Sequence, residues 1–231
     1  MGRPQRSSRA DGDRTANRIL EAAGPLFARL GFAETTSKSI AEAAGVDMAS
    51  INYHFGSRSG LYEATLTEAH RQLVSLRDLQ AIANARVPAI TKLEQFIEVL
   101  VGVACANRDW PAALMARELL SPSSHVHALL DSEIHPKLAL VQAILSEVSG
   151  IPLGHPALLR CEISVAAPCL MLLVAANGLP TPAHTVRQMP KADLVRHLLT
   201  YAQAGLSAIA QQVMAEDASP QTTQRKRSAQ G

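Results

Sequence analysis

Apolar residues return at steps of three and four along most of this 231-residue chain. Between Thr15 and Gly31 they are spaced as on one face of a helix, at Ile19, Leu20, Ala23, Leu26, Phe27 and Leu30. Leu and Ala dominate, β-branched runs are scarce, and aromatic residues make up only 3% of the chain. Both features favour helix over strand, so the sequence predicts an all-α fold.

Cap residues divide the N-terminal third into four expected helices. Thr15 and Gly31 bound the first helix, and Thr36 caps a short second helix that Gly45 ends. Asp47 caps a third helix over about 48–55. After a further cap at Ser57, a longer fourth helix carries the apolar residues Leu61, Tyr62, Leu66, Ala69, Leu73 and Leu76.

The third expected helix has two different sides. A step of 100° per residue brings Met48, Ile51 and Phe55 together and places Ala49, Ser50, Tyr53 and His54 opposite them, with Asn52 at the flank. Two short helices with a Gly-containing turn are typical of a helix-turn-helix, here 36–55, whose second helix enters the DNA major groove. The same pair also occurs in helical domains without a DNA role, where Tyr53 and His54 would be packing residues.

The exposed side of this helix has chemistry suited to base edges. Ser50 and Asn52 can form hydrogen bonds with bases, and Asn suits adenine N6 and N7. Ala49 and Met48 can pack against a thymine methyl group. The net charge of +2 indicates no particular partner, so the case for DNA depends on where individual groups lie.

Phosphate contacts are expected from five residues. Tyr53, His54 and Arg58 follow the base-reading positions, and Thr36 and Lys38 begin the preceding helix. A helix N-terminus adds a favourable partial positive charge for an anion. Such contacts set register and carry no sequence information.

We divide the chain into a flexible basic arm (1–12), a DNA-binding domain (13–73), a second helical domain (74–216) and a disordered tail (217–231). The arm either lies in a minor groove or is disordered. The second domain is expected to contain helices near 88–107, 110–121, 124–149 with a break at Pro136, 155–178 and 190–215.

Trp110, Met115, Arg117 and Met171 are candidate ligand-binding residues, because Met adapts to varied shapes and a charged pair, Arg117 and Glu118, interrupts an apolar helix. The alternatives are plain core packing for Trp110, Met115 and Met171 and an exposed ion pair for Arg117.

Several classes of protein and site are not expected. The chain lacks GxSxG, P-loop, GxGxxG and HExxH motifs, so we expect no catalytic residues, no cofactor and no enzyme. His125, His127 and His135 lack a recognised metal-ligand spacing. Three widely spaced cysteines in apolar stretches indicate buried thiols in a reducing cytoplasm. The apolar run 163–179 is expected to be a buried helix and not a membrane span.

The stretch "TANRILEAAGPLFARLGFAETTSKSIAEAAGVDMASINYHFGSRSGLYEAT" resembles the DNA-binding domain of TetR/AcrR-type repressors. Two segments resemble the CecR-like branch of this family: "INYHFGSRSGLY" and, more weakly, "WPAALMARELLSPSSHVHALLDSEIHPKL". The resemblance implies DNA contacts at Thr36, Lys38, Ser50, Tyr53, His54 and Arg58. In this pattern Arg58 replaces a usual Lys, Asn52 replaces a common Tyr, and Ser37 replaces an apolar residue.

The resemblance also implies a C-terminal ligand-binding and dimerisation domain, with a four-helix interface from 155–178 and 190–215 of each subunit. We therefore expect a cytoplasmic homodimer that binds a palindromic double-stranded DNA operator and is released by a small-molecule inducer. The first alternative is an all-helical protein-interaction adaptor without DNA binding. The second alternative is a small-molecule hydrolase or transferase.

Overall fold

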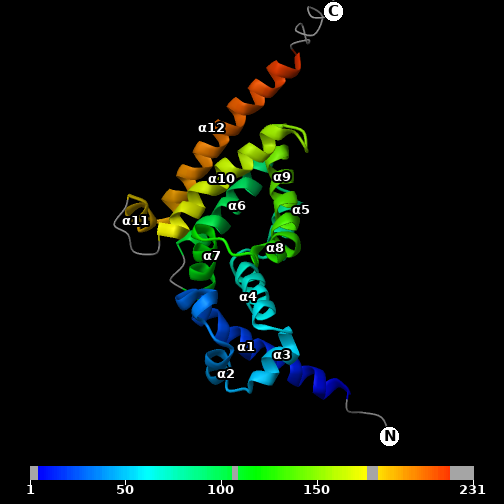
Figure 1. Ribbon diagram of the computed structural model, residues 1–231. Coiled ribbons are helices and arrows are strands. Elements are labelled where there is room, and N and C mark those ends of the chain that lie inside the picture. The colour runs from blue at the N-terminus through cyan, green and yellow to red at the C-terminus, as the bar shows by residue number, and fades with distance from the viewer. Residues whose placement is uncertain (1–4, 106–108, 176–181, 219–231) are drawn as a thin grey trace, which may run out of the picture.

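The computed structural model describes residues 5–105, 109–175 and 182–218, and every regular element in these ranges is a helix. Figure 1 shows two stacked parts. The smaller part contains α1 (Gln5–Glu34), α2 (Ser37–Ala44) and α3 (Met48–Phe55), and α4 (Arg58–Leu73) runs from it into the larger part. The predicted all-α fold with an N-terminal helix-turn-helix is confirmed.

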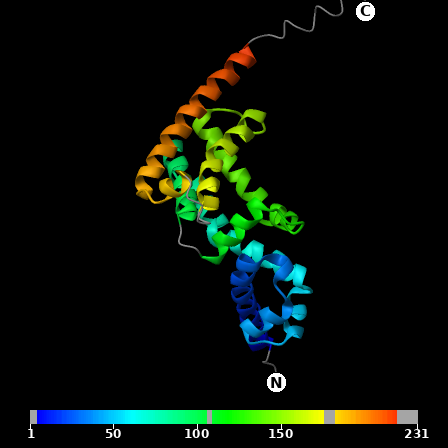
Figure 2. The same ribbon diagram turned by 60° about the vertical axis from the view of Figure 1, so that its left-hand side comes forward.

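The larger part is a bundle of helices. It contains α5 (Leu76–Asn84), α6 (Ala89–Ala104), α7 (Trp110–Leu120), α8 (Val126–Leu129), the π-helical turn η1 (Leu130–Ile134), α9 (His135–Ser149), α10 (Pro156–Ala175), α11 (Pro182–Arg187) and α12 (Lys191–Ala218). Buried side chains of α5, α6, α9, α10 and α12 form most of the core. Figure 2 shows that the two parts remain distinct when the molecule is turned.

The core of the N-terminal part extends into the larger part. Its own fully buried side chains include Ile40 of α2 and, from the predicted faces of the other helices, Ile19, Phe27, Ile51, Leu61, Tyr62 and Leu66. The same cluster contains Leu114 and Met115 of α7 and Leu129 of α8. The two parts therefore share apolar packing across their junction.

The predicted caps of α2, α3 and α4 are confirmed, whereas α1 continues through both of its predicted ends, Thr15 and Gly31. Thr36, Asp47 and Ser57 each accept a hydrogen bond from the backbone N–H three residues later, which satisfies one of the free donors at each helix start. Gly45 ends α2 in the left-handed region at φ 62°, a conformation that costs a residue with a Cβ about 1 kcal/mol or more.

The predicted flexible arm over 1–12 is wrong for residues 5–12, because α1 already begins at Gln5. No proline separates Gln5 from Thr15, and Thr15 is not a cap: its hydroxyl donates to the Asp11 carbonyl (3.0 Å) inside the helix. Arg14 pairs with Asp11 one turn earlier at 2.5 Å. Residues 1–4 lie outside the described part.

Two predicted boundaries in the larger part are also corrected. Leu76 does not continue the fourth helix, because Val74 is extended and Ser75 caps a separate α5. The chain does not break at Pro136, which lies in the first turn of α9, where proline needs no N–H partner. The irregularity falls earlier, at η1.

α10 is the one described helix that is long and apolar enough to cross a membrane, and 44% of its most apolar window is buried. One side packs into the bundle core, and the other remains exposed. Residues 176–178 of the predicted helix lie outside the described part, as do residues 219–231 of the predicted tail. Residues 217 and 218 are the last turn of α12.

Candidate nucleic-acid interface

Arg18 of α1 forms hydrogen bonds with the end of α2 and the turn that leads to α3. The Arg18 guanidinium Nη2 donates to the carbonyls of Ala44 (2.6 Å) and Gly45 (3.0 Å). These carbonyls end α2 and have no partner within the helix. Arg18 therefore ties the turn before α3 to α1, a role that the apolar pattern of the sequence did not indicate.

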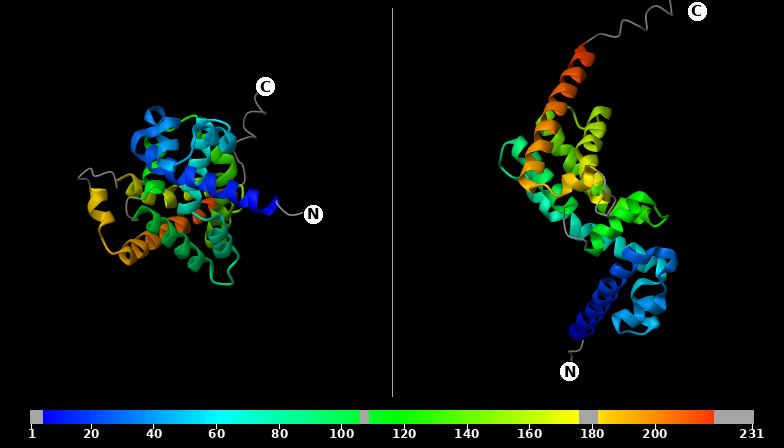
Figure 3. Two further views of the ribbon diagram at one scale, coloured as in Figure 1. Left: turned by 90° about the horizontal axis from the view of Figure 1, so that it is seen from below. Right: turned by 90° about the vertical axis from the view of Figure 1, so that its left-hand side faces the viewer.

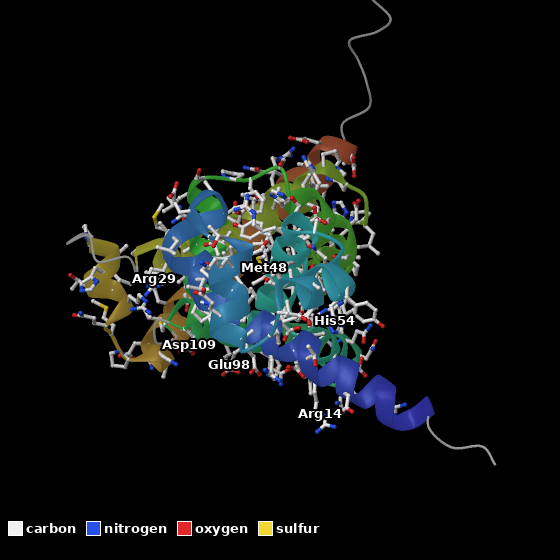
Figure 4. The ribbon with its side chains drawn as sticks, turned by 60° about the horizontal axis from the view of Figure 1, so that its bottom comes forward. Arg14, Arg29, Met48, His54, Glu98 and Asp109 are labelled. Atoms are coloured by element: carbon white, nitrogen blue, oxygen red, sulfur yellow. The ribbon has the colours of Figure 1, made fainter. Side chains whose placement is uncertain are left out.

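The outer side of α3 is open to solvent. Ala49 and Asn52 are exposed, Met48 is 54% exposed and Tyr53 is 85% exposed, whereas Ile51 is fully buried. Figure 4, with the bottom of the molecule turned forward, shows Met48 and His54 on the face that the N-terminal part presents to the viewer. The predicted division into a packed side and a contact side is thus present, except that Met48 belongs to the exposed side.

Ser50 is already engaged within the protein. Its hydroxyl donates to Asp47 Oδ1 at 2.6 Å, and its backbone N–H donates to the same oxygen at 2.7 Å. These two bonds lower the pKa of Asp47. While it donates to Asp47, the Ser50 hydroxyl can offer a base only its acceptor lone pairs.

His54 is half-buried between Tyr53 and the first helix. The Tyr53 and His54 rings meet edge to face with centroids 4.9 Å apart. A Cβ built on Gly12 would lie 3.8 Å from His54 Cε1, so the early turns of α1 pass beside this ring. Figure 3 shows those turns projecting past the rest of the N-terminal part.

The structure gives Arg58 a role other than the predicted phosphate contact. Its Nη1 donates to the carbonyls of Phe32 (2.9 Å) and Thr35 (2.7 Å), and its guanidinium lies 4.2 Å from the centre of the Phe32 ring. These carbonyls lie where α1 ends and the chain turns towards α2. Arg58 thereby satisfies acceptors that the helix cannot satisfy itself.

Thr36 and Lys38 lie at the start of α2, where both are exposed. The Thr36 hydroxyl is the helix cap, with Ser39 N donating to it at 3.1 Å. Lys38 lies 4.0 Å from Glu42 one turn along, a weak exposed pair. The Lys38 ammonium therefore remains available for a phosphate.

The four candidate ligand-binding residues do not converge on one site. Trp110 packs so closely against Gly24 of α1 that no Cβ would fit there, and Arg117 covers Gly31 in the same way. Met115 belongs to the N-terminal core, and Met171 is 61% exposed on the outer side of α10. Packing across the junction accounts for Met115 and Arg117, whereas Trp110 packs on Gly24 and also lines a cavity at the junction.

A buried hydrogen-bond network joins α4 to α7. The Tyr62 hydroxyl donates to Glu118 Oε1 at 2.6 Å, and Ser123 donates to Glu118 Oε2 through both its N–H and its hydroxyl at 3.0 Å. Glu118 is only 4% exposed. The sequence signal was a carboxylate in an apolar helix, but its partner Tyr62 was predicted only as core.

A second polar network joins α4 to η1 and α9. Arg71 Nε lies 2.6 Å from Glu133 Oε1, and Lys137 Nζ lies 2.8 Å from Glu133 Oε2 and 2.8 Å from His70 Nδ1. Burial and the Lys137 ammonium lower the pKa of His70 to about 4. Glu133 and Lys137 are almost fully buried, so neither charge can be left alone without cost.

The histidine-rich segment is used for packing and pairing. The ring of His125 lies 4.5 Å from that of Phe32 and 5.3 Å from that of Tyr62, and His135 lies 3.3 Å from Asp131. Among the described residues, no three His, Cys, Asp or Glu side chains are grouped so that they could hold a metal ion.

Two family models match this chain. One, described as "Bacterial regulatory proteins, tetR family", matches residues 19–65. The other, described as "HTH-type transcriptional dual regulator CecR, C-terminal domain", matches residues 89–220.

Individual proteins agree with these matches. The HTH-type transcriptional regulator RutR of Escherichia coli strain K12 is 34% identical over 140 residues, which span 59% of each chain. The regulator FadR from Bacillus halodurans superposes with a TM-score of 0.64 at 16% identity, covering 82% of this chain and 98% of that one. FadR from Bacillus subtilis, in complex with stearoyl-CoA, gives the same TM-score and identity over 81% of this chain and 97% of that one.

Proposed function

We propose that this chain, which belongs to the TetR family of bacterial regulatory proteins, is a ligand-responsive repressor that binds a palindromic operator as a homodimer. Family and fold make it a DNA-binding transcriptional regulator and not an enzyme. The repressor action, the palindrome, the inducer and a cytoplasmic location are our proposal.

The observation that carries this proposal is the uncharged outer side of α3. Asn52 is exposed and makes no side-chain hydrogen bond within the described residues, so its donor and acceptor are both available to adenine. Tyr53, Thr36 and Lys38 are assigned to phosphates, which position the helix in the groove. Arg58 leaves this set, because it serves the end of α1.

The exposed side of α10 and its neighbour α12 supports a dimer. Large apolar side chains stand open there: Leu159, Ile163, Leu170 and Met171 on α10, and Tyr201 on α12. Leu159, Ile163 and Leu170 fall on one stripe at 100° per residue. We assign these residues, the α10–α12 face, to contact the same face of a second copy, as a twofold interface requires.

A dimer would present two copies of α3 to DNA. Two such helices reach successive major grooves when they stand roughly 34–36 Å apart, and the operator is then palindromic. A small molecule acts on such a dimer only if it binds one conformation better than the other. FadR in complex with stearoyl-CoA is a protein of this fold with a small molecule bound, which supports an inducer here.

Selection from random duplexes, followed by fluorescence anisotropy on the selected operator, tests the proposal. We expect salt-sensitive binding to a palindrome. Asn52→Ala should lose discrimination at one position of each half-site, by about 1–3 kcal/mol, whereas Tyr53→Ala should weaken all duplexes alike. Failure to enrich any duplex at low salt would favour the protein-interaction adaptor.

A further inference from the structure

A cavity of about 930 Å³ lies at the junction of the two domains. Its walls come from α1, α4, α5, α6 and α7, so residues of both domains line it. Cavities that hold organic ligands usually have volumes of roughly 300–1,000 Å³. This one is large enough for a drug-sized molecule.

The inner wall of the cavity is mainly apolar. Pro25 and Ala28 come from α1, Leu73 comes from α4, and Val99 and Val103 come from α6. Trp110 lines the same cavity and is held in place by its contact with Gly24. A flat apolar body would find a preformed surface here.

Gly102 opens this wall. It lies within α6, where Ala would be a better helix former by about 1 kcal/mol, and a Cβ built on it meets no atom within 4 Å. The space beside Gly102 is therefore empty, and a side chain placed there would enter the cavity.

The rim of the cavity carries unpaired charges of both signs. Asp78 and Asp109 are exposed carboxylates and Arg29 is an exposed guanidinium, and none of the three makes an ion pair within the described ranges. Figure 4 shows Arg29 and Asp109 on the same edge of the molecule. These three described groups sum to one negative charge, so they favour a positive group over a negative one on a ligand that lies beside them.

We propose that this interdomain cavity binds an amphipathic organic cation, with its apolar body against Trp110 and the α6 wall and its positive group between Asp78 and Asp109. The inference rests on the proposed ligand-responsive function and names where the ligand binds and what kind it is. Because α1 and α4 form part of the wall, a bound molecule contacts the DNA-binding domain directly.

Three pyrene derivatives of matched shape provide the test: pyrenemethylamine is cationic, pyrenemethanol is neutral and pyrenecarboxylate is anionic. We expect the amine to bind the full-length protein about tenfold more tightly than the alcohol, and the carboxylate to bind most weakly. Fluorescence anisotropy of the pyrene measures each affinity. Tighter binding of the carboxylate than of the amine would overturn the proposal.

Substitutions at Gly102 locate the site. Gly102→Phe should place a ring in the cavity beside the α6 wall and weaken binding of the amine, whereas Gly102→Ala should keep it. Circular dichroism confirms that both variants fold. Asp78→Asn combined with Asp109→Asn provides a second route, with an expected loss of about tenfold for the amine, whereas Arg29→Gln should cause none. Undiminished binding in both the Phe variant and the double Asn variant would place the amine elsewhere.

The operator separates this inference from the function on which it rests. Coupling is reciprocal, so operator-bound protein should bind the amine more weakly than free protein. If the protein binds the operator but the Gly102 and Asp substitutions do not change its affinity for the amine, only the cavity proposal fails. If no duplex binds, the proposed function fails, and the pyrene measurements still decide whether the cavity is a cation site.

Discussion

Two arginine side chains, Arg18 and Arg58, stabilise the turns that precede α3 and α2 in the N-terminal domain. Arg18 holds the turn before α3, and Arg58 holds the corner where α1 gives way to α2. Both guanidiniums act on carbonyls that a helix end leaves without partners. The residue pattern marked Arg58 for phosphate because of its place after α3, but its hydrogen-bond partners lie more than twenty residues away in sequence, where spacing alone gives no information.

Arg58 should therefore matter more for stability than for DNA contact. Arg58→Ala leaves the Phe32 and Thr35 carbonyls unpaired and should lower the free energy of unfolding by about 1–3 kcal/mol in urea titrations. The free energy of unfolding of Arg58→Lys should lie between those of the wild type and Arg58→Ala, because an ammonium cannot reproduce the planar guanidinium. If Arg58→Ala has the stability of the wild type but binds the operator weakly, Arg58 contacts a phosphate.

His70 should make stability depend on pH. Its pKa is about 4 in the folded protein, against 6.5 for an ordinary histidine, because burial and Lys137 disfavour its charged form and Glu133 only partly opposes them. Protonation then favours the unfolded chain, so the free energy of unfolding should fall between pH 6.5 and about 4, by up to roughly 3 kcal/mol. His70→Gln should flatten urea-derived stabilities across that interval. An unchanged slope in this variant would show that other groups cause the fall.

At the scale of elements, α4 is the connection between the two halves. One end of it takes part in the N-terminal core, Tyr62 reaches α7, and His70 and Arg71 reach η1 and α9. A shift of α4 against the bundle would disturb two networks whose members are largely buried. Movements of this junction should therefore occur between discrete arrangements and not by small continuous sliding.

The Tyr62–Glu118 hydrogen bond offers a direct measure of this connection. Tyr62→Phe removes the donor and should cost about 1–3 kcal/mol of unfolding free energy, because Glu118 keeps only Ser123 as a partner. A double-mutant cycle with Glu118→Gln isolates the interaction between the two side chains. Strictly additive effects would mean that the two residues do not stabilise the protein through each other.

The sequence predicted some elements far better than others. α2 and α3 were predicted to within a residue because each has a capping side chain in front and a glycine behind. α5 and α11 were missed, since they are short and one of them continues the apolar spacing of α4. The ligand candidates were chosen by residue type along single helices. Trp110 and Arg117 each pack on a glycine of α1 that lies about 86 positions earlier, a contact that the sequence pattern does not reveal.

At the scale of the whole molecule, the α10–α12 face should determine the oligomeric state. Ile163→Asp places a charge in the centre of the proposed interface and should convert the dimer to monomers in light scattering, with a loss of operator affinity. Leu153→Asp is a matched control, because Leu153 is 64% exposed in a loop and Ile163 is 63% exposed on α10. Equal masses for both variants and the wild type would exclude this face.

The core of the DNA-binding domain includes Leu114, Met115 and Leu129, which the chain reaches only after α6 is complete. A fragment that stops after α4 lacks these three side chains and would leave the apolar cluster that contains Phe27 and Tyr62 incomplete. When DNA-binding domains are exchanged between regulators of this architecture, α7 and α8 should therefore be transferred together with the DNA-binding domain. In a chimera joined at the end of α4, the DNA-binding domain of one protein would pack against α7 and α8 of another, and this mismatch would be present even without DNA.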